Sequence, residues 1–464
     1  MMKWKKMFTT DSQIMFLKFC ISFICESVAT IFTLLLSTNF FMLTLNLIRE
    51  KPDFVIERLA VKNFSGQDVV KQILSVDEKR RATQVQLEAG LNRANVIAKA
   101  IGDMFKSGLK EQSGPFVSES VKLKEENSKL KDLLDETEKQ LQEILVRLPN
   151  LPSEKVPAGK SPEQNEVVHT EGEIPSLGDK TLPHWELATK YDIIDFDLGN
   201  KLTGAGFPVY KGKGARLHRG MINFFLDKAT AQGYKEIQPP IMVNEDSGFG
   251  TGQLPDKEGQ MYHVTADNLY LIPTAEVPVT NIYRDVILKE ENFPVKMTAY
   301  TPCFRREAGS YGKDVRGLNR LHQFDKVEIV QLQHPDKSYH TLEEMKNYVA
   351  GLLRMLELPF RILKLCGGDM SFASALTYDF EVFSAAQKKW LEVSSVSNFE
   401  SFQANRMKLR YKDSNGKTQL AHTLNGSALA FPRIVAALLE NNQSEKGIRI
   451  PAALAAYCGF EMID

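Results

Sequence analysis

The chain has 464 residues and no formal net charge, because 58 Lys and Arg balance 58 Asp and Glu. Hydrophobic residues make up 43% and charged residues 25%, which is ordinary for a soluble globular protein and excludes a wholly disordered or fibrous chain. A neutral chain does not hold nucleic acid over its whole surface, so such a partner has to be bound by a local patch or by shape. The five cysteines are scattered without a CxxC pair, which argues against a disulfide scaffold or a cysteine zinc site and fits a reducing compartment.

Residues 1–41 form an apolar leader after a basic start, with Lys18 and Glu26 inside its apolar stretch. A signal anchor or transmembrane helix is one interpretation, since about 20 apolar residues span a bilayer. Each central charge opposes it by about 2.5–3.5 kcal/mol. We favour non-native upstream sequence, with Met42 as the true start. The expected location is then the cytoplasm, without membrane contact unless the leader is real.

Residues 69–104 are predicted to form one long helix, because their inward-facing positions recur at alternating spacings of three and four. A second seam of this kind runs from Leu123 to Leu148, and residues 107–118, with two Gly and a Pro, are expected to reverse the chain. The pattern predicts a coiled-coil hairpin over about 69–148, within an N-terminal domain over 42–150. Either it is a spacer or dimerisation arm, or it is a rigid arm that grips a long ligand by shape.

Residues 151–183 are rich in Pro, Gly and Glu and are predicted to be a linker. Residues 184–464 mix β-rich and helical stretches without regular crossover helices. This favours an α+β domain, an antiparallel sheet flanked by helices, over a doubly wound sheet. The sequence has no GxxxxGK[ST] loop, so a nucleotide would not be bound in the P-loop manner.

Four clusters in this domain carry residues suited to chemistry. Arg305, Arg306 and Glu307 stand where one predicted strand ends before a long basic tip, and the Arg fork suits phosphate or carboxylate. A turn at 425–427 is expected to start an apolar helix that carries Arg433. Taken singly, the first cluster is more simply a surface salt-bridge group, and Arg433 a solvent-facing residue.

The other two clusters offer oxygen atoms. Glu392 to Asn398 (EVSSVSN) places a carboxylate and hydroxyls on a strand, which are ligand types that Mg²⁺ accepts, although an ordinary half-exposed strand has the same pattern. Thr274, Ala275 and Glu276 follow an apolar strand and are expected to form a small pocket loop.

Taken together, these segments resemble the seryl-tRNA synthetases, a family of class II aminoacyl-tRNA synthetases. GYKEIQPP (233–240) is similar to class II motif 1, FRREAGS (304–310) to motif 2 and LNGSALAFPR (424–433) to motif 3. The TAE and EVSSVSN segments are similar to markers of the seryl branch, and the hairpin resembles its tRNA-binding arm. The resemblance runs from about Met42 to the end of the chain.

The resemblance implies that serine and ATP form seryl-adenylate, with Mg²⁺ on the phosphates, and that serine then passes to tRNA. Arg305, Glu392 and Arg433 are the expected catalytic residues, with Arg305 between the α-phosphate and the serine carboxylate and Arg433 on the γ-phosphate. Glu307 is expected to accept from the adenine amino group, and Glu392 and Ser395 to bind Mg²⁺. The full set of expected ATP contacts is Arg305, Arg306, Glu307, Leu321, Glu392, Val393, Ser394, Ser395 and Arg433. The expected serine contacts are Thr274, Ala275, Glu276, Arg305, Glu328, Asn425 and Ser427.

The implied partners are tRNA(Ser), L-serine, a second copy of the chain in a homodimer and, where the organism has one, tRNA(Sec). No zinc is expected, because the cluster of metal ligands that marks the zinc-dependent archaeal variant is not seen in the sequence. Arg306 and Val396 depart from the residues usual in the family, Ser and Cys. Two alternatives are a paralogue that loads an amino acid onto a carrier protein, which would not need the arm, and a membrane-tethered scaffold with a dead catalytic domain, which would have lost the ligands.

Overall fold

The computed structural model describes residues 45–178, 181–256, 258–307 and 316–464. The leader over 1–41 and the centre of the basic tip, 308–315, lie outside the described residues. Within these ranges, no helix combines the length and the apolar character needed to cross a membrane.

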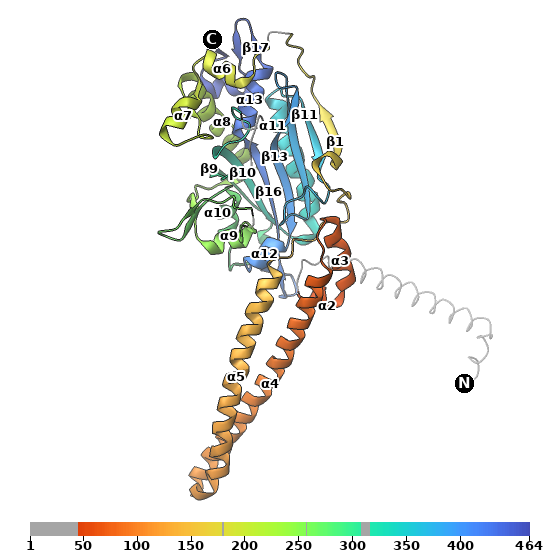
Figure 1. Ribbon diagram of the computed structural model, residues 1–464, viewed down its shortest axis with the longest axis vertical. Helices are drawn as coiled ribbons and strands as arrows, with labels where there is room; N and C mark the ends of the chain where they lie inside the picture. The colour runs from red at the N-terminus through yellow and green to blue at the C-terminus, as the bar shows by residue number, and fades with distance from the viewer. Residues whose placement is uncertain (1–44, 179–180, 257, 308–315) are drawn as a thin grey trace, which may run out of the picture. The chain divides into compact units, whose positions relative to one another are not determined.

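The first described elements are helical, and the two longest helices lie side by side (Figure 1). They are α2 (Leu45–Glu50), α3 (Pro52–Val61), α4 (Gln67–Lys106) and α5 (Gly114–Leu145). Ile73 and Thr83 of α4 and Thr137 of α5 are buried at positions of the predicted seams, so the predicted helical hairpin is confirmed. The predicted reversal over 107–118 is too long, because a short 3₁₀ turn at Lys110–Ser113 leads straight into α5. Pro115 does not prevent this, since the first turn of a helix makes no use of its missing N–H.

The chain on either side of the hairpin binds the loop 371–374 of the C-terminal domain. The Lys62 ammonium donates to the carbonyl oxygens of Ser371 and Ser374 at 2.8 and 2.7 Å. The buried Asn150 amide donates to the carbonyl oxygen of Ala373 at 2.9 Å. These bonds tie the chain on both sides of the hairpin to the backbone of this loop.

The C-terminal domain is built on an eight-stranded sheet of order β1-β11-β12-β13-β16-β10-β9-β4. All neighbours pair antiparallel except β4 and β9, so the predicted α+β class with an antiparallel sheet is confirmed. The strands of this sheet are β1 (Glu166–Glu171), β4 (Lys235–Glu236), β9 (Val295–Phe304), β10 (Gln323–Gln333), β11 (Phe360–Lys364), β12 (Leu376–Ser384), β13 (Lys389–Glu400) and β16 (His422–Ala430).

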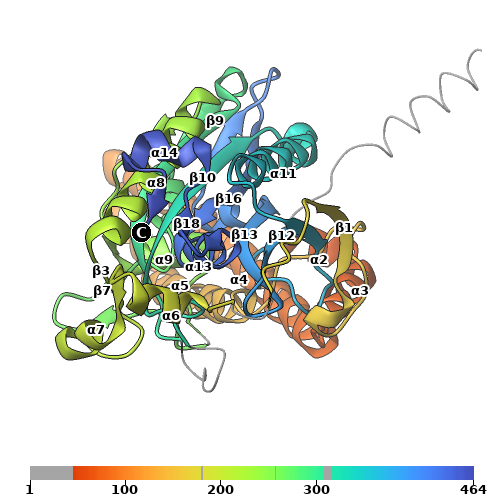
Figure 2. The ribbon, with the colours of Figure 1, turned by 90° about the horizontal axis from the view of Figure 1, so that it is seen from above.

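Helices and small sheets surround this sheet (Figure 2). The helices are α6 (His184–Lys190), α7 (Phe196–Leu202), α8 (Gly212–Ala231), α9 (Glu245–Thr251), α10 (Glu276–Asn281), α11 (Ser338–Met355), α12 (Phe402–Arg406), α13 (Phe431–Asn441) and α14 (Ala452–Cys458). The short strands are β2 (Ile194–Asp195), β3 (Val209–Tyr210), β5 (Met242–Val243), β6 (His263–Val264), β7 (Leu269–Leu271), β8 (Ile287–Lys289), β14 (Arg410–Lys412), β15 (Thr418–Leu420), β17 (Gln443–Ser444), β18 (Gly447–Arg449) and β19 (Met462–Ile463).

Strand β10 separates the core from the polar side of the sheet, because successive side chains of a strand point to opposite faces. Val327 and Ile329 are fully buried in the largest hydrophobic cluster, together with side chains of α8, α11 and α13. The alternate positions Lys326 and Glu328 lie on the other face, where Glu328 approaches Thr274 ahead of α10. The alternation therefore places two charged residues on the face opposite this cluster.

The predicted turn and helix start at 425–427 is wrong, because these residues lie inside β16. Gly426 pairs with Ile329 of β10 and with Val396 of β13. A Cβ atom at Gly426 would lie 3.2 Å from Val396 Cγ2, so the glycine serves close packing between strands rather than a turn. Helix α13 begins only at Phe431, with Pro432 in its first turn.

Part of the segment predicted as a linker belongs to the sheet. Strand β1, which reads EVVHTE, pairs antiparallel with β11 at one edge. Most of its side chains are exposed, so the strand lacks the alternating pattern by which a half-buried strand is recognised.

Candidate functional site

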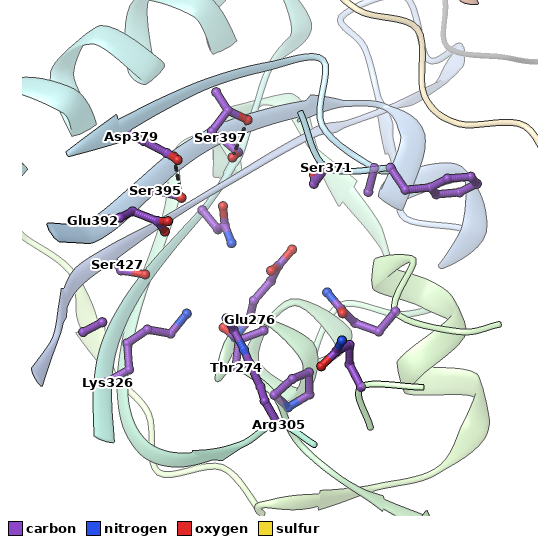
Figure 3. A pocket seen from close by; sticks show the side chains of 18 of the residues that line it. Thr274, Glu276, Arg305, Lys326, Ser371, Asp379, Glu392, Ser395, Ser397 and Ser427 are labelled. Carbon is purple, nitrogen blue, oxygen red and sulfur yellow. Dashed lines mark hydrogen bonds between the residues drawn. The ribbon is translucent and has the colours of Figure 1, made fainter. Parts of the chain in front are cut away.

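A cleft of about 850 Å³ opens on the polar face of the sheet (Figure 3). The residues of the sequence-based set that line it are Thr274, Glu276, Arg305, Glu307, Leu321, Glu392, Val393, Ser394, Ser395, Asn425, Ser427 and Arg433. They come from β13, β16, α10, α13 and the loops that precede α10, follow β9 and precede β10. The fold therefore brings segments that are more than 150 residues apart in sequence, from Thr274 to Arg433, into a single site.

Three residues of that set do not line the cleft. Ala275 is fully buried in a hydrophobic cluster, where its side chain supports the neighbouring Thr274 and Glu276. Arg306 is exposed, and its backbone N–H donates to the Gln260 carbonyl oxygen at 2.8 Å. Glu328 lies behind the wall, with its carboxylate next to Thr274 and Ser427.

Arg305 follows the last residue of β9, and its backbone N–H donates to the His322 carbonyl oxygen at 2.9 Å. Its guanidinium lies over the Phe324 ring, with 5.2 Å between the central carbon and the ring centroid. Stacking leaves the edge of the guanidinium, with its N–H groups, open toward the cleft, and such a fork suits a phosphate or carboxylate.

Glu276 and Lys326 line the cleft beside α10, and the Glu328 carboxylate lies directly behind them; we call this group of three charged residues the floor. Lys326 Nζ lies 2.5 Å from Glu328 Oε2, and the same oxygen accepts from Thr274 at 3.3 Å. Glu328 Oε1 is buried and has no hydrogen-bond partner among the described residues. Burial and then the charge of Glu328 raise the pKa of Glu276 to about 7, opposed by a 2.6 Å hydrogen bond from the Gln403 amide. With two carboxylates and one ammonium, this floor can take one more cation or several hydroxyl donors.

The oxygen atoms of β12 and β13 form another wall. The Ser395 hydroxyl donates to Asp379 at 2.5 Å, which leaves the lone pairs of its oxygen for other partners (Figure 3). The pKa of Asp379 is raised, because the carboxyl is buried and Glu392 is nearby. Glu392 and Ser395 are hard oxygen donors that fit Mg²⁺, an ion that usually takes only one or two protein carboxylates beside substrate phosphates. Within the described ranges, no group of three or more His, Cys, Asp or Glu is placed to hold a metal ion.

Arg433 stands in the first turn of α13 and is fixed by two carbonyl oxygens. Its Nε donates to Asn319 at 3.0 Å and its Nη1 to the Glu392 backbone at 2.9 Å. A guanidinium has five N–H groups, so these two bonds orient the fork without using it up.

Sequence reasoning missed several residues of this site. Lys326 and Asp379 line the cleft, and Gln403 bonds to Glu276. The available signal for Lys326 was its position directly before the β-rich run VEIVQL, two residues ahead of Glu328 and therefore on the same face of the strand. Gln403 gives no such signal, because only the fold brings α12 to α10.

A sheet of this order, with Arg305 and Arg433 facing one cleft, defines the core of a class II aminoacyl-tRNA synthetase. Residues 262–442 match the family of class II tRNA synthetase core domains (G, H, P, S and T), and residues 42–152 match the seryl-tRNA synthetase N-terminal domain. The chain belongs to the seryl-tRNA synthetase family.

Relatives of this family cover nearly the same span. The serine–tRNA ligase of Salinibacter ruber is 49% identical over 91% of this chain and 99% of its own length, and that of Akkermansia muciniphila is 44% identical over the same shares. The crystal structure of a seryl-tRNA synthetase from Pyrococcus horikoshii complexed with ATP is similar with a TM-score of 0.85 and 31% identity, over 91% of this chain and 99% of that one. The predicted family is therefore confirmed.

Proposed function

We propose that this chain attaches L-serine to tRNA(Ser) in an ATP-dependent reaction that passes through seryl-adenylate. The observation that carries the proposal is one cleft that holds two oriented arginine forks, Arg305 and Arg433, beside the buried Glu276 and Glu328 carboxylates. The arginines suit a polyphosphate and a carboxylate, and the carboxylates suit an ammonium and a hydroxyl. ATP and serine together present these groups.

In this proposal the chain acts by holding anions in line rather than by supplying a nucleophile. Arg305 holds the α-phosphate next to the serine carboxylate, Arg433 holds the terminal phosphate, and Glu307 accepts from the adenine amino group. Leu321, Val393 and the backbone near Ser394 complete the nucleotide side. Mg²⁺, held by Glu392 and Ser395, would neutralise charge on the phosphates.

Selectivity for serine is assigned to the floor of the cleft. Thr274, Glu276, Glu328 and Ser427 offer acceptors for the ammonium and the hydroxyl, with Asn425 beside them. A site that hydrogen-bonds a hydroxyl rejects an analogue without it, because buried polar groups would be left without partners.

The test is ATP–pyrophosphate exchange with serine, threonine and alanine in separate assays. Serine is expected to drive exchange best, and Arg305→Ala is expected to abolish it. Exchange driven by threonine or alanine and not by serine would remove the substrate assignment.

The arm formed by α4 and α5 is proposed to bind the tRNA by the shape of an RNA helix, which proteins read largely through its backbone. A shortened variant, in which a short turn replaces residues 84–136, keeps the packed base that contains Ile73 and Leu141. We expect it to retain serine-dependent exchange and to lose tRNA charging. Full charging by this variant would exclude the arm from the reaction.

The remaining proposals follow from family membership. We infer a homodimer in the cytoplasm, with an N-terminal domain over 42–150 and a catalytic domain over 184–464, and serylation of tRNA(Sec) where that tRNA exists. Light scattering of the purified chain tests the dimer, and charging of transcribed tRNA(Sec) tests the second tRNA.

A further inference from the structure

A buried histidine holds the loop that follows the basic tip. His184, the first residue of α6, has none of its surface exposed, and its Nε2 accepts from the Leu318 backbone N–H at 2.8 Å. A Cβ atom at Gly317 would lie 2.2 Å from this nitrogen, and Gly317 has a φ of +68°. Only glycine therefore lets the loop come this close to the imidazole.

The contact fixes the tautomer of His184. A backbone N–H can only donate, so Nε2 carries the lone pair and Nδ1 carries the proton. Nδ1 lies 2.7 Å from Glu440 Oε1 and donates to it. Protonation of Nε2 would set two N–H groups against each other, so the arrangement requires a neutral imidazole.

Glu440 is a fully buried carboxylate that organises four donors. It accepts from the His184 backbone N–H and the Gln387 amide, both at 2.9 Å, from His184 Nδ1, and from the Ser384 hydroxyl. Because N–H and O–H groups converge on this carboxylate from four directions, it acts as the acceptor in every one of these bonds, which gives each of them its direction.

A second connection runs from Glu440 to the same loop. Since Gln387 donates its amide to Glu440, its oxygen faces away and accepts from the Asn319 amide at 3.0 Å. The Asn319 carbonyl oxygen in turn accepts from Arg433 Nε at 3.0 Å. Leu318 and Asn319 line the cleft, whereas His184 and Glu440 are not among its lining residues.

We propose that His184 and Glu440 are positioning residues for the terminal phosphates of ATP, because they fix the backbone at 317–319 and thereby the direction of Arg433. This inference rests on the proposed function, in which Arg433 holds the γ-phosphate. Neither residue lines the cleft. Their effect should therefore appear where the β- and γ-phosphates are present and be missing where they are not.

The test compares the affinities for ATP and AMP in His184→Asn and His184→Gln. An asparagine amide reaches about as far as Nδ1 and can keep the bond to Glu440, whereas a glutamine oxygen can reach the Nε2 position and accept from Leu318. We expect His184→Asn to bind ATP about tenfold more weakly with AMP affinity within about twofold, the loss expected for one charge-assisted bond. His184→Gln should recover much of the ATP affinity.

The matched control is His422→Asn. His422 is another buried histidine of this domain, bonded through Nδ1 to the Ser338 hydroxyl at 2.8 Å, and it is not among the residues that line the cleft. It should lose thermal stability without changing the ratio of the two affinities. Equal losses of ATP and AMP binding in His184→Asn, or an unchanged ratio in a folded variant, would overturn the proposal.

A second variant covers the case in which His184→Asn does not fold. Gln387 is only half-buried, and Gln387→Met removes the acceptor of the Asn319 amide while leaving His184 in place. It should lower the ATP-to-AMP affinity ratio in the wild-type background and leave it unchanged when Arg433 is replaced by Met. Additive losses in the double variant would overturn the proposal. An absence of serine-dependent exchange in the wild-type chain would instead overturn the proposed function, so the two failures are distinguishable.

Discussion

Replacing Lys326 by Met should strongly destabilise the catalytic domain. The side chains of Lys326 and Glu328 are 7% and 1% exposed, and their charged atoms are 2.5 Å apart. Without the ammonium, Glu328 keeps only the hydroxyl donors Thr274 and Ser427, at 3.3 and 3.5 Å, and one oxygen without a partner among the described residues. Removing one partner of a buried ion pair leaves an uncompensated charge and costs about 3–5 kcal/mol.

The size of this effect can be measured by thermal unfolding. For a domain of this size, a loss of about 3–5 kcal/mol lowers the melting temperature by roughly 5–10 °C. The loss arises because the Glu328 carboxylate stays buried while the ammonium that balances its charge is removed.

A matched substitution separates burial from pairing. Lys364→Met removes the ammonium from a pair with Glu166 at a similar distance, 2.6 Å, whose side chains are 20% and 52% exposed. Exposed pairs contribute about 0–1 kcal/mol, so the melting temperature should change little. Equal shifts of the melting temperature for Lys326→Met and Lys364→Met would refute the reasoning.

Three further predictions concern the floor of the cleft, to which serine binding is assigned in the proposed function, and the arm. The pKa of Glu276 is raised to about 7, so its carboxylate forms as the pH rises through 7. Because the proposed serine site uses this carboxylate as an acceptor, KM for serine in exchange assays should fall between pH 6 and 8. Glu276→Gln should flatten this dependence. Gln403→Leu removes the 2.6 Å donor to Glu276 and should raise KM for serine about tenfold, with KM for ATP unchanged; a parallel rise in both constants would contradict the assigned role. Gly90→Leu should raise KM for tRNA without changing ATP–pyrophosphate exchange. A Cβ atom at Gly90 would lie 2.0 Å from Asn127 Oδ1, so α4 and α5 must separate to make room for the side chain. Unchanged charging kinetics would argue against a rigid arm.

The long elements and the ordered motifs of this chain could be predicted because their signals are local. The seams of α4 and α5 repeat over many turns, and the motif residues Arg305 and Arg433 stand in recognisable strings. The segment at 425–427 could not be predicted from its composition. Asn-Gly-Ser suggests a turn, but pairing with β10 and β13 on both sides holds it extended.

The residues that support the site were harder to find than those expected to touch ligands. Gln403 and His184 act through partners that lie far away in sequence, Glu276 and Leu318. Each looks ordinary in its own segment, and its importance comes from contacts that only the tertiary structure creates. Strand β1 was missed for a related reason, since an exposed edge strand gains its stability from backbone pairing and not from an apolar pattern.

The bonds from Lys62 and Asn150 to the loop 371–374 connect the N-terminal half of this protein to the edge of the cleft. A fragment that began after these residues would lose the donors that hold the backbone of this loop in place. Chimeras that exchange arms between relatives therefore need to transplant both donors along with the helices, and a catalytic half expressed alone should aggregate or misfold rather than work as a minimal ligase.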